Sequence, residues 1–377
     1  MRFFAWGRFV AMVVKEFTQM RRDRMTFAMM IGLPLVQLVI FGFAINMDPK
    51  HLPAAAIVAD ASPFGRSILG AMENSGYFAV THLATSEAEA DDWLQRGKVQ
   101  FVVSIPADFS RALLRGERPA ILVEADATDP SATSNAIAAL EGLNRTALQH
   151  DLVGGLAGLK SGPPPFEVRI HRRYNPEGST QYNVVPGLIG VILTMTMVIM
   201  TALAVTRERE RGTMEALLAT PVSPLEVLIG KIVPYILVGF IQVTIVFVVA
   251  RLLFDVPMLG SSIVFGAVVL LFIAANLAVG ITFSTVARNQ LQAMQMAIFF
   301  FLPSIMLSGF VFPFRGMPTW AQAIGEVLPL THFLRIVRGV MLKGTEWTHV
   351  MPDVWPLAAF LLVAVTIALA RYRRTLD

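Results

Sequence analysis

Six long apolar segments separated by polar stretches dominate this chain of 377 residues. A helix of about 20 apolar residues is long enough to cross the roughly 30 Å of hydrocarbon in a bilayer. The segments that reach this length with few charges are 25–46, 184–205, 232–254, 262–287, 291–312 and 351–371. The pattern therefore predicts an α-helical polytopic membrane protein with six transmembrane helices, the first of them over 25–46.

The segment 47–178, between the first two predicted spans, is polar enough to fold in water. Short β-rich runs alternate in it with helical patterns, which is typical of α/β packing. The predicted strands are Ala55–Ala59, Tyr77–His82, Val99–Ile105, Ile121–Glu124 and Phe166–His171, and the predicted helices are Phe64–Asn74, Glu87–Arg96, Ala107–Leu114 and Pro130–His150. A segment of roughly 130 residues can bury a core of its own, so we expect an inserted α/β domain.

Lysine and arginine residues gather beside one set of span ends. They are Arg2, Arg8, Lys15, Arg21, Arg22 and Arg24, then Arg207, Arg209, Arg211 and Lys231, then Arg288, Arg371, Arg373 and Arg374. The opposite short loop, 255–261, has none. Because short cytoplasmic loops are enriched in these residues, we expect both chain ends and the loop 206–231 in the cytoplasm and the α/β domain outside it. The net charge of +4 then reflects topology and does not indicate a nucleic-acid partner.

In the first 24 residues, apolar and polar side chains recur with the period of an α-helix and fall on opposite faces of it. Trp6, Val10, Val13, Phe17 and Met20 fall on one face of a helix, whereas Arg8, Lys15, Gln19 and Arg22 fall on the other. This predicts an amphipathic helix over 1–24. It either lies along the inner leaflet, in contact with membrane lipids, or packs on the protein's own cytoplasmic edge.

Residues 313–345 contain helical patterns that are too short and too broken to cross a bilayer. Two interpretations stay open for them: they dip back into the outer leaflet, or they cap the outer mouth of the protein. Arg335 and Arg338 are three positions apart and so share a helix face. There they would either bind anionic headgroups or snorkel to the membrane surface.

The loop 206–231 begins with alternating charges and is punctuated by a glycine and a proline. Gly212 interrupts the helix that leaves the membrane, and Pro221 ends a helix of about two turns over Thr213–Ala219. Ser223 suits an N-cap and Pro224 a first helical position, so the next helix is expected to begin at Pro224. A short helix held between two spans is either an inert connector or a docking element for a partner.

Residue types that would support catalysis do not occur in a useful arrangement. The chain has no cysteine, its six histidines lack metal-ligand spacing, and serine, histidine and aspartate form no nucleophile pattern. With 55% hydrophobic and only 15% charged residues, the composition is that of a membrane protein. We therefore expect that this chain is not an enzyme and holds neither a cofactor nor a metal ion.

The interiors of the second to fifth predicted spans offer only amides and hydroxyls, such as Gln242, Asn276 and Gln295. Carriers driven by an ion gradient normally keep ionisable residues inside the membrane to move the coupling ion. The pattern disfavours such a carrier, although sodium sites built from backbone atoms stay open. It favours an external energy source, namely a separate ATPase that acts on the loop 206–231.

Several short motifs together resemble one family of transport proteins. They are Tyr174-Asn175-Pro176-Glu177, Val185-Pro186-Gly187, Arg207 to Glu215 with the sequence RERERGTME, Thr220-Pro221, Gly230-Lys231-Ile232-Val233-Pro234-Tyr235 and Ser308-Gly309-Phe310. The chain resembles the permease subunit of bacterial ABC-2-type exporters, in the branch with a large extracytoplasmic domain between the first two spans. The resemblance extends over nearly the whole chain.

This resemblance implies a partnership in the inner membrane of a bacterium. In similar proteins two permease subunits, identical or sister chains, form a channel at their interface, and each docks an ABC ATPase that holds ATP and Mg. Proteins that resemble this one export drugs or other amphiphiles, often beside a periplasmic adaptor and an outer-membrane channel. Other branches of the family move lipids or polysaccharides, so the cargo stays open.

Two groups of residues follow as candidate sites. The expected ATPase-coupling residues are Arg207, Glu208, Arg209, Glu210, Arg211, Gly212, Thr213, Met214 and Glu215. The expected walls of the translocation path are Met195, Met197, Phe299 and Phe300, on the second and fifth spans. Methionine and phenylalanine suit varied apolar ligands, but the same residues more often face lipid or a neighbouring helix.

A second class of function stays open beside export. The chain would then be a membrane-anchored sensor or assembly scaffold, whose outer domain binds a ligand and whose charged loop signals. Such a protein needs no continuous path through the membrane.

Overall fold

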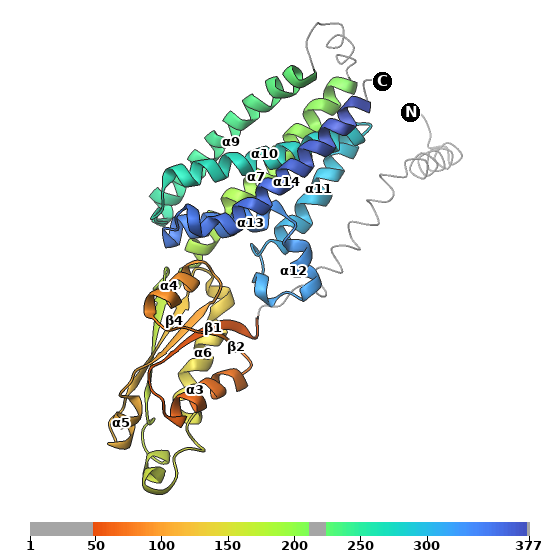
Figure 1. Ribbon diagram of the computed structural model, residues 1–377. Helices are drawn as coiled ribbons and strands as arrows, with labels where there is room; N and C mark the ends of the chain where they lie inside the picture. The colour runs from red at the N-terminus through yellow and green to blue at the C-terminus, as the bar shows by residue number, and fades with distance from the viewer. Residues whose placement is uncertain (1–47, 211–223, 375–377) are drawn as a thin grey trace, which may run out of the picture.

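The computed structural model describes residues 48–210 and 224–374 (Figure 1). They form a sheet domain, 48–173, and a bundle of long helices, 180–210 with 224–374. The predicted amphipathic helix over 1–24, the predicted first span over 25–46 and the predicted short helix over Thr213–Ala219 lie outside the described residues.

The sheet domain contains one sheet of five strands within the described residues. The strands are β1 (Leu52–Val58), β2 (Phe78–Leu83), β3 (Phe101–Ile105), β4 (Ala120–Asp126) and β5 (Glu167–Arg173), in the spatial order β2-β1-β3-β4-β5. β1 is parallel to β2 and to β3, whereas β4 is antiparallel to β3 and parallel to β5. Each predicted strand is confirmed within a few residues of its expected ends.

Helices cover both faces of this sheet, because its central strands are apolar on both sides. Ala54, Phe101 and Val103 pack against α3 (Pro63–Asn74) and α6 (Pro130–Thr146) on one face. Ala55 and Val102, the intervening positions, pack against α4 (Glu87–Gln95) on the other. The strand period of two thus places alternate residues in two separate cores, as an α/β domain requires. A further short helix, α5 (Phe109–Leu114), follows β3.

Five described helices are long and apolar enough to cross a membrane. They lie within α7 (Thr180–Glu210), α9 (Pro224–Phe254), α10 (Ser262–Val286), α11 (Gln290–Leu307) and α14 (Trp347–Arg374). These helices match the second to sixth predicted spans, and α9 begins at Pro224 as expected. The prediction for the fifth span ran five residues too far, because the chain leaves the helix after Leu307 and turns at Gly309, whose φ is +82°.

The segment predicted to hold short helical pieces does so. It contains η3 (Phe314–Gly316), α12 (Thr319–Gly325), α13 (Pro329–Arg338) and η4 (Gly339–Lys343). The apolar side of α13 packs into the bundle, where the rings of Phe333 and Phe272 stack with their centroids 3.9 Å apart. Close approach to α7 depends on Gly190, since a Cβ there would stand 2.8 Å from Leu330 and from Phe333. These pieces form the end of the bundle nearest the sheet domain (Figure 1).

Candidate functional site

Polar contacts fasten the sheet domain to the bundle at this end. Lys343 Nζ of η4 lies 2.5 Å from Asp126 Oδ2 at the end of β4, and each side chain is only 8% exposed. Asn183 Nδ2 of α7 donates to Asp129 Oδ1 over 3.0 Å. Arg315 donates to the carbonyl oxygen of Gly97 over 2.8 Å. These contacts come from three separate segments of the bundle, so the junction is specific to one arrangement of the two parts.

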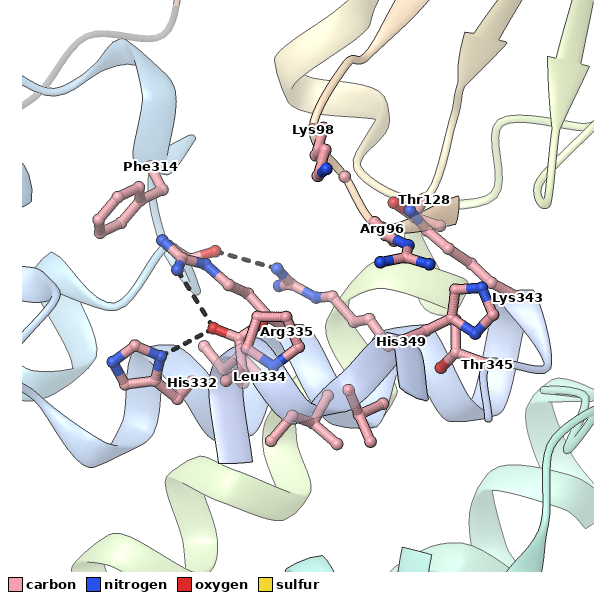
Figure 2. A pocket seen from close by; sticks show the side chains of 18 of the residues that line it. Arg96, Lys98, Thr128, Phe314, His332, Leu334, Arg335, Lys343, Thr345 and His349 are labelled. Carbon is pink, nitrogen blue, oxygen red and sulfur yellow. Dashed lines mark hydrogen bonds and ion pairs between the residues drawn. The ribbon is translucent and has the colours of Figure 1, made fainter. Parts of the chain in front are cut away.

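A cavity of about 600 Å³ lies at this junction. Figure 2 shows Arg96 and Lys98 on the sheet-domain side of it and His332 and Arg335 on the α13 side, with Lys343 reaching across toward the sheet domain. Its charged lining consists of Arg96, Lys98, Arg315, Arg335, Arg338 and Lys343 together with Asp126, Asp129, Glu326 and Asp353. The six cations outnumber the four carboxylates, and Arg96 also pairs with Asp92 over 2.8 Å just outside the lining, so a small excess of positive charge remains when the histidines are neutral.

One part of this lining is a closed set of ion pairs. Arg335 Nη2 lies 2.5 Å from Glu326 Oε1, and Arg335 Nη1 lies 3.4 Å from Asp353 Oδ1. His332 is buried, with Nδ1 2.8 Å from Asp353 Oδ1 and Nε2 2.8 Å from the carbonyl oxygen of Glu326. Burial works to lower the pKa of His332, but its hydrogen bonds to Asp353 and to that carbonyl outweigh it and raise the pKa above the usual value.

Another part of the lining is cationic without a carboxylate partner. Arg338 donates from Nε to the carbonyl oxygen of Asn183 over 3.4 Å and from Nη1 to that of Gly309 over 3.3 Å. Its Nη2 is shielded from solvent and has no hydrogen-bond partner among the described residues. Burial lowers the pKa of Arg338, against the opposing effect of the negative charges of Asp129 and Asp126, neither of which bonds to it. An arginine held only by carbonyl groups keeps its full charge to offer to another group.

The predicted coupling residues begin at the opposite end of the bundle from the sheet domain. Arg207 and Glu210 are exposed on the last turn of α7, and Glu208 and Arg209 lie between them on the same helix. The remaining candidates, Arg211, Gly212, Thr213, Met214 and Glu215, lie outside the described residues.

Glu210 joins α7 to the start of α11. Its carboxylate accepts a hydrogen bond of 2.8 Å from the backbone N–H of Gln290 and another from the Gln290 side-chain amide. These hydrogen bonds lower the pKa of Glu210. Gln290 is the first residue of α11, where a carboxylate is favoured by the helix dipole. The end of α7 is therefore linked to a second membrane helix.

The four predicted wall residues do not converge on one space in this chain. Met197 is completely buried, and Phe300 packs edge-on against Phe283 with ring centroids 5.9 Å apart. Met195 is 48% exposed on α7, and Phe299 is 37% exposed on the neighbouring α11. Two of the four thus pack between helices, and the other two face the outside of the bundle.

A comparison with known proteins assigns the chain to a family. The sequence pattern of the ABC-2 family transporter proteins matches residues 24–370. The chain belongs to this family. The Escherichia coli K12 protein named "Probable multidrug ABC transporter permease YbhS" is 31% identical over 99% of this chain and 98% of its own length. YbhR, named in the same way, is 28% identical over 97% and 98%. The "Inner membrane transport permease YhhJ" is 29% identical over 91% and 93%.

This ABC-2 permease is thus a multi-pass membrane protein, and its family implies a partner ATPase. The sequence pointed to the charged end of α7 but not to the cavity. Arg335 and Arg338 were noticed from their shared helix face, whereas Lys98 and Arg315 carried no local signal. Only the fold brings those residues together, because they belong to separate segments of the sheet domain and the bundle.

Proposed function

We propose that this permease is the membrane subunit of an ATP-driven exporter, with six spans, both chain ends in the cytoplasm and the sheet domain outside it. The observation that carries the proposal is the course of α7. This helix starts just after the sheet domain and ends at Glu210. Its 31 residues give a length of about 46 Å, enough to place the sheet domain and the charged segment on opposite sides of a bilayer (Figure 1).

The charged segment 207–215 is the element on which the ATPase acts. ATP and Mg bind on that separate subunit, and this chain contributes no cofactor site. Glu210 and Gln290 couple α7 to α11, so a push on the charged segment moves two membrane helices together. A helix as long as α7 is stiff along its axis, which makes it suited to carry this displacement toward the sheet domain.

The spans themselves support an external energy source. Gln242 accepts a hydrogen bond of 2.9 Å from Thr196, which links α9 to α7. Asn276 donates to the carbonyl oxygen of Phe272 within α10 over 2.9 Å. These intramembrane polar groups serve helix packing and backbone bonding, as such groups commonly do. Among the residues that the structure describes, neither side chain pairs with an ionisable residue of the kind that a proton-driven carrier uses.

The cargo we propose is a drug or another amphiphile, moved along the interface of two permease subunits, identical or sister chains. The names of YbhS and YbhR as multidrug transporter permeases support this class of cargo. Met195 and Phe299 face outward and are available to line such an interface, whereas Met197 and Phe300 hold the helices behind it. A periplasmic adaptor and an outer-membrane channel would complete the route out of a bacterial cell.

Affinity purification of the tagged full-length permease from membranes tests the proposal. Mass spectrometry would identify what co-purifies with the wild type and with a variant whose charges at 207–215 are reversed. A control variant reverses Glu167, which is exposed on β5 far from this segment. We expect an ABC ATPase with the wild type and the control and its loss from the 207–215 variant. An ATPase absent from all three would favour the sensor or scaffold instead.

A further inference from the structure

We propose that the cavity between the sheet domain and the bundle binds the anionic headgroup of a membrane amphiphile. The first support is its charge. Asp126 pairs with Lys343, and Glu326 and Asp353 are taken by Arg335 and His332. After this pairing the lining still holds cations whose partners are neutral.

Arg338 is the centre of the proposed site. Its two hydrogen bonds within the described residues go to carbonyl oxygens at 3.3 and 3.4 Å, which is long for a charged donor. Its Nη2 is shielded from water and has no partner among the described residues. The negative charges of Asp129 and Asp126 act on this guanidinium only through space, and a guanidinium withdrawn from water is costly unless an anion bonds to it directly. An oxyanion that enters the cavity would supply that missing charge.

Two further cations, Arg315 and Lys98, line other sides of the cavity. Within residues 48–210 and 224–374, the one hydrogen bond that the Arg315 side chain donates goes to the carbonyl oxygen of Gly97. The side chain of Lys98 is exposed and makes neither a hydrogen bond nor an ion pair within the described part of the chain, although its backbone N–H donates to the carbonyl oxygen of Trp93. Figure 2 shows Lys98 on the sheet-domain side of the cavity, across from Arg335. The nearby Asp129 is already engaged by neutral donors, Ser131 and Asn183.

The position of the cavity relative to the spans points to a lipid-like occupant. Trp355, which lines the cavity, is 67% exposed on the span of α14. Trp320 and Trp347 are each 40% exposed on neighbouring segments. Tryptophan gathers at the level of the lipid headgroups. An amphiphile could therefore lay its apolar chain beside Trp355 while its headgroup enters the cationic cavity.

The binding test uses the purified full-length permease in a neutral detergent. Native mass spectrometry measures binding of phosphatidylglycerol, which is anionic, and of phosphatidylcholine, which is zwitterionic. The variants are Arg338→Gln and Lys98→Gln. The control is Arg251→Gln, an exposed arginine in the last turn of α9 that does not line the cavity. It lies toward the same end of the bundle, because the loop after α9 bonds to η4 through Gly260 and Val340.

We expect the wild type and Arg251→Gln to prefer phosphatidylglycerol, and Arg338→Gln to bind it roughly tenfold or more weakly. Lys98→Gln keeps the test valid if Arg338→Gln fails to fold, because the Lys98 side chain is exposed and bonds to none of the described residues. It should weaken binding severalfold. Equal binding of the two lipids, or equal binding by all four proteins, would overturn the proposal.

A second arm separates a lipid from a soluble anion. Inorganic phosphate is added alone, and thermal unfolding of the wild type and of the Arg338 and Lys98 variants is followed. Phosphate could raise the unfolding temperature of the wild type but of neither variant, while phosphatidylglycerol does not bind. That result would show an anion site in the cavity but overturn its assignment to an amphiphile. This proposal concerns ligand binding alone, so the binding test can fail while the proposed coupling to an ATPase holds, and the reverse.

Discussion

A Cβ atom on Gly280 of α10 would stand 1.9 Å from Oγ1 of Thr201 on α7 and 2.6 Å from the carbonyl oxygen of Val198. The two helices therefore cross at backbone contact distance. Thr201 cannot turn away without loss, since its hydroxyl donates to the carbonyl oxygen of Met197 over 2.6 Å. Membrane helices commonly use small residues for such close approach.

Gly280→Ala should separate α7 from α10 and lower the stability of the permease by about 1–3 kcal/mol, the usual cost of overpacking. The matched control is Gly266→Ala on the same helix, where an added Cβ meets nothing within 4 Å. Thermal unfolding of both variants in detergent measures the difference. Equal stabilities would show that the two helices relax apart without cost.

Lys343→Met should destabilise the junction by about 3–5 kcal/mol, because it leaves the Asp126 carboxylate buried without its cation. The double variant Lys343→Met with Asp126→Leu should recover much of this loss. Arg115→Met, which breaks an exposed pair with Glu117, should cost no more than about 1 kcal/mol. Unfolding free energies of the four proteins test the expectation, and a small effect of Lys343→Met alone would contradict it.

The junction should also respond to pH through His332. Its pKa is raised in the folded protein by Asp353 and by the carbonyl of Glu326, against the effects of burial and of the neighbouring Arg335. A raised pKa means that the charged form stabilises the fold. This stabilisation is fully present below about pH 6.5, the ordinary pKa of histidine, and is lost as the pH rises through the higher folded value.

Thermal unfolding of the wild type across this range should therefore show stability falling as the pH increases. His332→Gln should flatten that dependence while it preserves a polar side chain. The control His171→Gln replaces an exposed histidine of the sheet domain, and it should leave the dependence unchanged. A profile of His332→Gln with the slope of the wild type would assign the titration to another group.

Gln290→Ala should reduce export while the ATPase still co-purifies, because it removes the side-chain amide that donates to Glu210. The backbone N–H of residue 290 still donates to the same carboxylate, and the charged segment stays intact, so we expect a partial loss of export. Arg371→Gln, an exposed charge near the end of α14, serves as the control. Export assays and co-purification are measured on the same preparations. Loss of the ATPase from Gln290→Ala would show that this link shapes the docking surface itself.

Much of the local structure is predictable from the sequence alone. The spans over 184–205 and 262–287 and the strand near Ala55–Ala59 follow from runs and alternations of apolar residues, which act on neighbours along the sequence. Ser223 and Pro224 likewise predicted where α9 begins. The end of α11 was predicted less well, because Gly309 turns the chain while the sequence is still apolar.

The sequence by itself determined that this chain is a membrane protein with an α/β domain, since hydrophobic length and period depend only on residues close together in the chain. The tertiary structure alone decided the sheet order, the pairing of Lys343 with Asp126 and which charged residues line the cavity. Whether Arg338 reaches water or is shielded from it depends on Asn183 and Gly309, which lie far from it in sequence. The burial of a group and its charge partners depend on all the residues near it in space, and only the fold determines which residues those are.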